Sequence, residues 1–138
     1  MYPEELCKPM REELTSSGFN ELTTSEEVDE LFNNKNQTFL IFINSVCGCA
    51  AGSARPGVIL STQNAIRPDK FTTVFAGQDK EATQRAREYM DPYPPSSPSI
   101  ALFKNGEIVH FIERHEIEGN LKHVIAENLI NAFNLHCQ

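Results

Sequence analysis

Two cysteines separated by one glycine, Cys47-Gly48-Cys49, are the residues whose type and spacing point most directly to chemistry. A thiolate attacks disulfides, and a second thiol beside it resolves the mixed disulfide that forms. We expect Gly48 to let the backbone bend enough to bring the two sulfur atoms together. A disulfide between them closes a very short ring, and strain in that ring raises its reduction potential. The pair therefore predicts thiol–disulfide exchange, with a reduction potential above ~−270 mV.

The elements around the pair favour this chemistry. Residues 38–43 form a continuous β-branched and aromatic run, which predicts a strand buried on both faces. The alanine-rich residues after Cys49 predict a helix that is kinked at Pro56 and continues through Leu60. Sites in α/β sheets lie beyond the carboxyl ends of strands, and a helix N-terminus lowers the pKa of a thiol placed there. The sequence thus places the dithiol at a strand-to-helix junction.

The rest of the chain alternates between helical and strand patterns. Helices are expected at residues 3–17, 24–32, 80–90 and 118–135, and strands near residues 20–22, 71–76, 99–103 and 108–112. The expected apolar stripes are Leu6, Met10 and Leu14 in the first helix, and Leu121, Val124, Ile125, Leu129, Ala132 and Phe133 in the last. Asn105-Gly106 predicts a hairpin turn between the last two strands. The order predicts an α/β fold with a mixed central sheet flanked by helices.

Composition limits the classes of protein to consider. The chain has 138 residues, of which 40% are hydrophobic and 22% are charged, as in an ordinary globular domain. We expect a single domain over residues 1–138, with residues 1–18 as a helical extension, and a core that needs no disulfide. The chain contains no apolar run of ~18 residues, and its N-terminus has no apolar signal segment. A cytoplasmic location with reduced cysteines is therefore expected, away from membranes.

The charge is unevenly distributed. The formal net charge is −7, and residues 1–36 hold nine of the 19 acidic side chains but only three of the 12 basic ones. An acidic chain lacks the basic face that nucleic-acid phosphates require, so nucleic acid is not an expected partner. The acidic N-terminal part is either a solvated helix surface or a means of repelling wrong partners.

The order of elements, with a dithiol opening a kinked helix and Pro98 before a hairpin strand, resembles the thioredoxin fold. Within that fold the chain is similar to the bacilliredoxins over nearly its whole length. The resemblance is carried by the Cys-Gly-Cys pair within residues 44–52, by residues 94–103 and 113–119, and by the acidic leading helix ending near residues 22–24.

The resemblance implies an activity and roles for particular residues. Bacilliredoxins remove bacillithiol, a small thiol with a malate unit, from protein cysteines that carry it as a mixed disulfide. By this resemblance Cys47 is the nucleophile and Cys49 the resolving thiol. Pro98 is a cis-proline facing the dithiol, and Ser97 offers backbone hydrogen bonds to an extended substrate. The implied partners are bacillithiolated proteins and bacillithiol itself, which is a substrate; no bound cofactor and no metal are implied.

Two arginines are candidates for further roles. Arg55 lies two turns beyond the dithiol, and there it would steady a thiolate or an anionic thiol ligand, or else remain an ordinary surface arginine. Arg114 and Glu118 are spaced to pair at the start of the last helix, and we expect this pair to be structural.

The other cysteines and the histidines suggest less. Cys7 is expected to be a small packed residue, and Cys137 is either a packed or a free tail thiol, with a resolving role less favoured. The four histidines show no metal-ligand spacing.

Three alternatives to bacillithiol removal remain. The first is a weak disulfide isomerase that uses the same dithiol. The second is a soft-metal module that binds Cu(I) or Zn through the two thiolates. The third is a redox-sensing interaction module whose acidic leading helix binds a partner.

Overall fold

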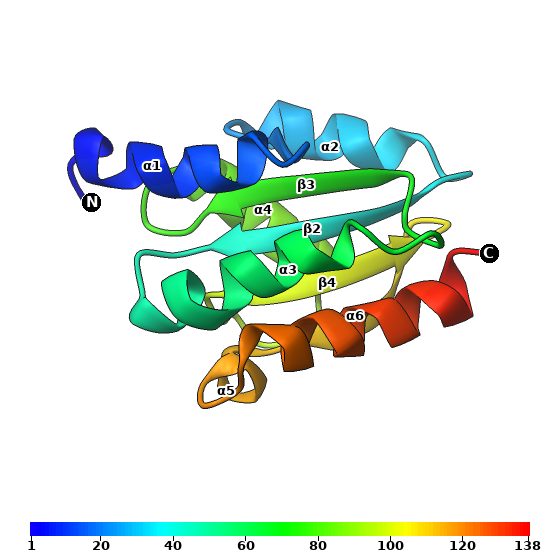
Figure 1. Ribbon diagram of the computed structural model, residues 1–138. Helices are drawn as coiled ribbons and strands as arrows, with labels where there is room; N and C mark the ends of the chain where they lie inside the picture. Colours follow the sequence, from blue (N-terminus) through cyan, green and yellow to red (C-terminus); the bar gives the residue numbers. More distant parts are fainter.

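Five strands form one mixed sheet in the order β1-β3-β2-β4-β5 in the computed structural model, which describes residues 1–138 (Figure 1). The strands are β1 (Asn20–Glu21), β2 (Thr38–Asn44), β3 (Lys70–Phe75), β4 (Ser99–Lys104) and β5 (Glu107–Ile112). Strand β3 runs parallel to β1 and β2, whereas β4 is antiparallel to both β2 and β5. The mixed sheet and its hairpin are those expected from the sequence.

Helices cover both faces of this sheet. They are α1 (Glu4–Thr15), α2 (Ser25–Asn33), α3 (Arg55–Ser61), α4 (Lys80–Tyr89), α5 (Arg114–Ile117) and α6 (Lys122–His136), and a π-helical segment η1 (Ala50–Ala54) precedes α3. In Figure 1, α3 and α6 lie in front of the sheet and α4 lies behind it. The result is a three-layer α/β sandwich.

Strand β2 is the centre of the molecule because both of its faces are buried. Leu40 and Phe42 point into the core beneath α1, α3 and α6, whereas Phe39, Ile41 and Ile43 point into the core beneath α2 and α4. Side chains of a strand alternate between the two faces of a sheet, so a continuous apolar run contributes to two cores at once. Burial on both sides fixes the position of the strand end from which the cysteine pair emerges.

The first and last helices differ in detail from the expected apolar stripes. Helix α1 buries Cys7 and Leu14, and Leu6 is exposed. Leu121 and Val124 are also exposed; the helix expected at residues 118–135 begins only at Lys122, and a separate short helix, α5, precedes it. Gly119 adopts a positive φ of 79°, a conformation that ends α5 and lets the chain turn before α6 begins.

The helix after the cysteine pair is not simply kinked at Pro56. Residues 50–54 form a π-helical turn, in which the N–H of Arg55 donates to the carbonyl of Ala50, five residues earlier. Pro56 stands at the start of the regular helix α3, where its missing N–H costs least. The expected break therefore lies one turn closer to the dithiol, in the form of a π-turn.

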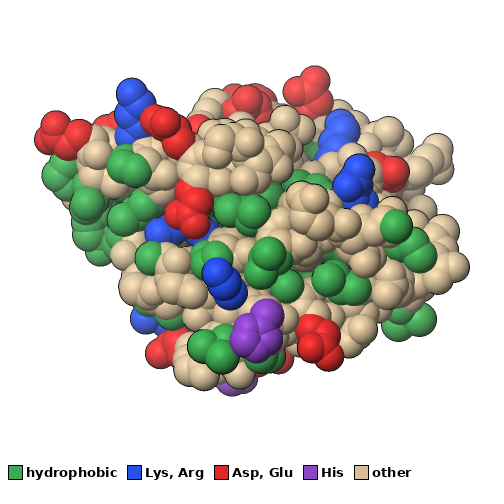
Figure 2. Space-filling model, viewed as in Figure 1, with side chains coloured by type: hydrophobic (Ala, Val, Ile, Leu, Met, Phe, Trp, Pro, Cys, Tyr) green, Lys and Arg blue, Asp and Glu red, His purple; other side chains and the backbone are tan.

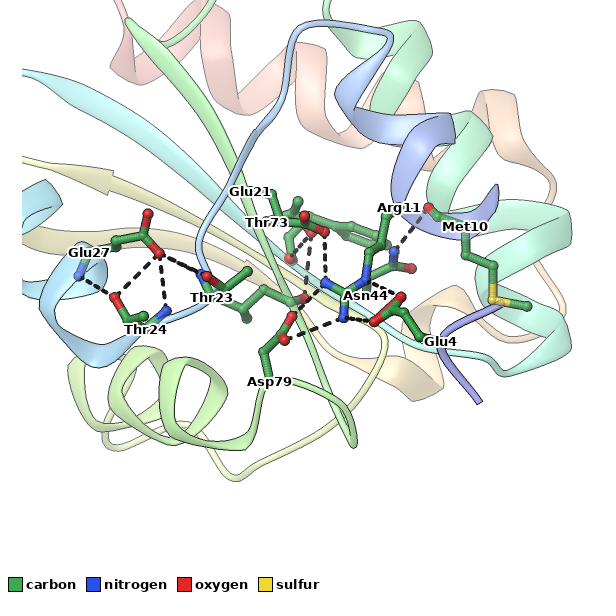
Figure 3. Close-up of polar contacts among 12 residues, drawn as sticks. Glu4, Met10, Arg11, Glu21, Thr23, Thr24, Glu27, Asn44, Thr73 and Asp79 are labelled. Carbon is green, nitrogen blue, oxygen red and sulfur yellow. Dashed lines mark hydrogen bonds and ion pairs between the residues drawn. The ribbon is translucent and has the colours of Figure 1, made fainter. Parts of the chain in front are cut away.

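The acidic N-terminal part is joined to the rest of the fold through arginines. Arg11 of α1 binds Glu4, Glu21 and Asp79, with closest nitrogen–oxygen distances of 3.0, 2.8 and 2.6 Å (Figure 3). Acidic side chains gather along the upper edge in Figure 2, over α1 and α2. Leu14 of α1 belongs to the core beneath α3 and α6, so α1 packs on the same face of the sheet as these two helices. None of the helices has the length and hydrophobicity needed to cross a membrane.

Candidate active site

Cys47 lies three residues beyond β2, at the carboxyl end of the central strand. The segment is held by Arg55, whose Nη1 donates to the Asn44 side-chain oxygen and to the Ser45 carbonyl, both at 2.9 Å. The Cys47 N–H in turn donates to Ser45 Oγ at 3.1 Å. These contacts fix the backbone from which the Cys47 side chain projects.

The Cys47 sulfur is surrounded by donors. The N–H of Cys49 donates to it at 3.4 Å, and the Cys49 sulfur lies 2.7 Å away. Partial burial raises the pKa of Cys47, but hydrogen bonds from the Cys49 thiol and from backbone N–H groups, together with the charge of Arg114, outweigh burial and leave this pKa below its ordinary value. Cys47 is therefore the thiol of the pair that ionises first.

Cys49 has the opposite character. Burial, the hydrogen bond to Cys47 and the charge of the Cys47 thiolate raise the pKa of Cys49 to about 11. Its side chain packs against the core beneath α1, α3 and α6, whereas Cys47 lines a surface groove. Cys47 thus ionises at a lower pH and lines the groove, whereas Cys49 keeps its proton to a higher pH.

Arg114 is a site residue that sequence reasoning assigned to structure alone. It pairs with Glu118 at 3.0 Å as expected, but its Nη2 also donates to the Cys47 sulfur at 3.1 Å. Strand β5 pairs with β4, so the chain leaving β5 lies beside the chain entering β4. This pairing was predicted from the hairpin signal, and it could have placed the first residues after the hairpin near residues 97–98.

The segment before β4 completes the site. The Ser97–Pro98 peptide bond is cis, the isomer that the family resemblance implies. The Ser97 carbonyl accepts from Arg114 Nη1 at 3.2 Å, and Ser97 lines the same groove as Cys47. The Asp91–Pro92 bond is also cis, which the sequence gave no reason to expect.

Two expectations about the site need correction. Arg55 is almost fully buried and binds Glu13 at 2.9 Å besides Asn44 and Ser45, so its guanidinium positions the strand end and makes no contact with either sulfur. Gly48 has no positive φ, and an added Cβ would meet no atom within 4 Å. The bend between the cysteines therefore does not require glycine.

The remaining thiols and histidines lie apart from the dithiol. Cys7 is fully buried, which confirms it as a packed residue, and burial raises its pKa. Burial also raises the pKa of Cys137, which lies near Thr38 at the far end of β2, roughly 20 Å from the dithiol end. This distance excludes a resolving role for Cys137 within one chain in this conformation. The one group of three possible metal ligands, Glu113, His115 and Glu116, contains neither cysteine of the pair.

Comparisons with known proteins agree with this geometry. A family model described as disulphide isomerase matches residues 2–137. A bacilliredoxin of Cytophaga hutchinsonii is 59% identical over 129 residues, which cover 94% of this chain and 95% of the relative. A bacilliredoxin of Shouchella clausii is 55% identical over 137 residues, covering 99% of this chain and 94% of the relative.

Solved structures with similar backbones are thioredoxins. A Schistosoma mansoni thioredoxin has a TM-score of 0.59 and 22% identity, and the match covers 85% of this chain and 96% of that one. A Fasciola hepatica thioredoxin has a TM-score of 0.58 and 18% identity, covering 83% and 99%. At this identity the likeness shows the fold, and the relatives above show the family. The chain belongs to the bacilliredoxin family of thioredoxin-fold thiol–disulfide oxidoreductases.

Proposed function

We propose that this protein removes bacillithiol from protein cysteines that carry it as a mixed disulfide. The observation that carries the proposal is the pairing of an accessible, low-pKa Cys47 with a high-pKa Cys49 one residue away. The name bacilliredoxin of relatives at 59% and 55% identity supports bacillithiol as the thiol.

In the first step the Cys47 thiolate attacks the bacillithiol sulfur. A disulfide forms between Cys47 and bacillithiol, the original disulfide breaks, and the client cysteine leaves as a thiolate that takes a proton from solvent. Arg114 Nη2 and the Cys49 N–H, which hold the Cys47 thiolate in the free protein, place its sulfur at the groove. The client is reduced and Cys47 is oxidised.

The second step has two routes. Cys49 loses its proton and attacks the Cys47 sulfur, forming the Cys47–Cys49 disulfide and releasing bacillithiol. Two external thiol groups must then supply the two electrons that restore the dithiol, and they leave as a disulfide. Alternatively, a second bacillithiol thiolate attacks the bound bacillithiol sulfur, so that bacillithiol disulfide leaves and Cys47 returns to the thiolate.

A release assay tests the proposal. A client protein with a single cysteine is loaded with bacillithiol or with glutathione and mixed with the wild-type chain, and the freed client thiol is measured by mass spectrometry over time. We expect faster release of bacillithiol than of glutathione, and loss of release with Cys47→Ala. Equal rates for the two loaded thiols, or undiminished release by Cys47→Ala, would contradict the proposal.

Disulfide isomerisation is a second candidate, favoured by the description of the matching family model. Refolding of a scrambled disulfide protein separates the two activities. An isomerase restores the native pairing catalytically, whereas an enzyme restricted to mixed disulfides with small thiols leaves the scrambled protein unchanged.

A further inference from the structure

A groove of about 380 Å³ opens beside the nucleophile. Its lining includes Cys47, Arg114, Ser97, Gly77 and Arg87. This volume falls within the ~300–1,000 Å³ typical of small-molecule sites. The groove therefore has room for a small thiol attached to Cys47.

Arg87 is the unexplained residue of this groove. It forms no ion pair, and its Nε is buried without any hydrogen-bond partner. Its guanidinium makes one hydrogen bond, a long one of 3.4 Å from Nη2 to the Ser96 carbonyl. Burial lowers the pKa of Arg87, which reflects the cost of keeping this cation partly desolvated and unpaired. A bound anion would remove that cost.

The two guanidinium groups of the groove are joined through one short segment. Arg114 donates to the Ser97 carbonyl and to the Cys47 sulfur, and Arg87 donates to the neighbouring Ser96 carbonyl. Arg87 is therefore in contact with the segment that precedes Pro98, and it lines the same groove as the nucleophile. A ligand bonded to the Cys47 sulfur would have one cation at its bond and a second further along the groove.

A second cavity, of about 490 Å³, continues past Arg87 along α4. It is also lined by Gly77, Lys80 and Thr83, and the Thr83 hydroxyl is the only other buried side-chain polar atom without a partner. Glu88 and Asp91 line this cavity too, so its charge is mixed. Arg87, which has an unpartnered donor, and Lys80 are the cations of this lining. The part of the cavity beside them is the part suited to an anion.

We propose that Arg87 binds a carboxylate of the small thiol while that thiol is bonded to Cys47, and that Arg87 is thereby a specificity-determining residue. The substrate class is a low-molecular-weight thiol that bears carboxylate groups, and bacillithiol fits through its malate unit. A guanidinium fork matches a carboxylate in a bidentate manner. The identity of the thiol rests on the proposed function, whereas the preference for a thiol that carries carboxylates does not.

Three loaded peptides separate charge preference from thiol identity. One peptide with a single cysteine carries bacillithiol, glutathione or the uncharged 2-mercaptoethanol as its mixed disulfide. The rate constant for release of each is measured with the wild-type chain, and the readout is the ratio of the bacillithiol rate to the 2-mercaptoethanol rate. The ratio cancels any general loss of folding or of Cys47 reactivity.

Arg87→Gln is expected to lower this ratio by about tenfold or more, the loss typical of one charge-assisted contact. Arg87→Lys, which keeps the charge without the fork, should lower it less. The matched control is Arg85→Gln on the same helix, because Arg85 is already paired with Asp29 and Glu88 and does not line the groove. It should leave the ratio unchanged.

The outcomes distinguish this inference from the function on which it rests. An unchanged ratio in Arg87→Gln, or a wild-type ratio near one, overturns the carboxylate site, even if bacillithiol is released faster than glutathione. Equal wild-type rates for bacillithiol and glutathione contradict the proposed thiol. If both rates then fall relative to 2-mercaptoethanol in Arg87→Gln, the carboxylate site stands.

Discussion

Cys47 and Cys49 differ in pKa although only one residue separates them. Both are partly buried, which raises the pKa of each. The difference arises because the donors converge on Cys47, and because its thiolate then disfavours a second negative charge on Cys49. This asymmetry assigns attack to Cys47 and resolution to Cys49.

Arg114→Ala should make Cys47 less reactive at neutral pH. Removing the guanidinium 3.1 Å from the sulfur takes away a favourable charge, so the pKa of Cys47 rises and the thiolate fraction at pH 7 falls. We expect alkylation of Cys47 by iodoacetamide to slow about threefold to tenfold at pH 7, and its pH midpoint to move upward.

His115→Ala is the matched control, because His115 is the next residue on α5 and faces Glu113 rather than Cys47. Alkylation followed by mass spectrometry from pH 5 to 10 measures both variants. An Arg114→Ala profile that overlays the wild-type profile would show that Arg114 does not stabilise the thiolate.

The spacing of the two cysteines leads to a second prediction at the residue scale. A disulfide across Cys47-Gly48-Cys49 closes a ring shorter than that of a Cys-x-x-Cys pair, and ring strain favours the reduced form. Titration against glutathione buffers should give a reduction potential well above ~−270 mV. A value at or below this figure would contradict the ring-strain argument.

Among the elements, the π-helical turn η1 and helix α3, which follow the dithiol, pack against α6. Gly57 of α3 allows the close contact, since an added Cβ would lie 2.8 Å from Ile125 Cβ and 2.9 Å from the Lys122 carbonyl oxygen. Both positions are closer than real Cβ contacts, and one of them is backbone. The two helices would have to separate to accept any side chain there.

Gly57→Ala should therefore lower the free energy of unfolding by about 1–3 kcal/mol, the usual cost of overpacking. Gly52→Ala is the control, because a Cβ at Gly52 meets nothing within 4 Å. Denaturation in urea measures both. Equal stability of the two variants would mean that α3 and α6 move apart at little cost.

The elements themselves were largely predictable, because strand and cap signals are local. The apolar run at residues 38–43 lies within β2, and the helix expected at residues 24–32 is α2, which Thr24 and Glu27 cap. The exposed Leu6 and Leu121 were misassigned, since helical periodicity shows which residues share a face but not which face is covered. The short helix α5 was not expected, and α6 begins four residues after the expected start at residue 118, because Gly119 adopts a positive φ that helical periodicity does not reveal.

For the molecule as a whole, α1 links β1 to the start of α4 through the ion pairs of Arg11. Burial lowers the pKa of Arg11, but its hydrogen bonds to Asp79, Glu4 and Glu21 outweigh burial and raise it (Figure 3). The guanidinium also lies 5.0 Å from the centre of the Phe75 ring. Removing Arg11 would leave three carboxylates close together without a cation.

Arg11→Ala should accordingly lower the free energy of unfolding by about 2–3 kcal/mol. The control is Lys8→Ala on the same helix, because Lys8 is exposed and lies 3.9 Å from Glu12, a geometry worth little. Thermal unfolding followed by circular dichroism measures both variants. If both substitutions lower the free energy of unfolding by a similar small amount, the ion pairs of Arg11 do not stabilise the fold as argued.

The site was only partly predictable, because some of its residues come together only in the complete fold. Cys47, Cys49 and Pro98 carry motifs that are readable one residue at a time. Arg114 and Arg87 reach the groove only because β5 pairs with β4 and α4 packs beside the segment before Pro98. A single sequence shows their charge but not these long-range neighbours.

The most direct test of the account is to trap the first intermediate. The Cys49→Ala chain is mixed with a client protein loaded with bacillithiol, and intact mass and peptide mapping follow. We predict that bacillithiol accumulates on Cys47 and that the client leaves with a free thiol. A bacillithiol adduct on Cys7 or Cys137 instead, a disulfide between the chain and the client, or no adduct at all would contradict the account.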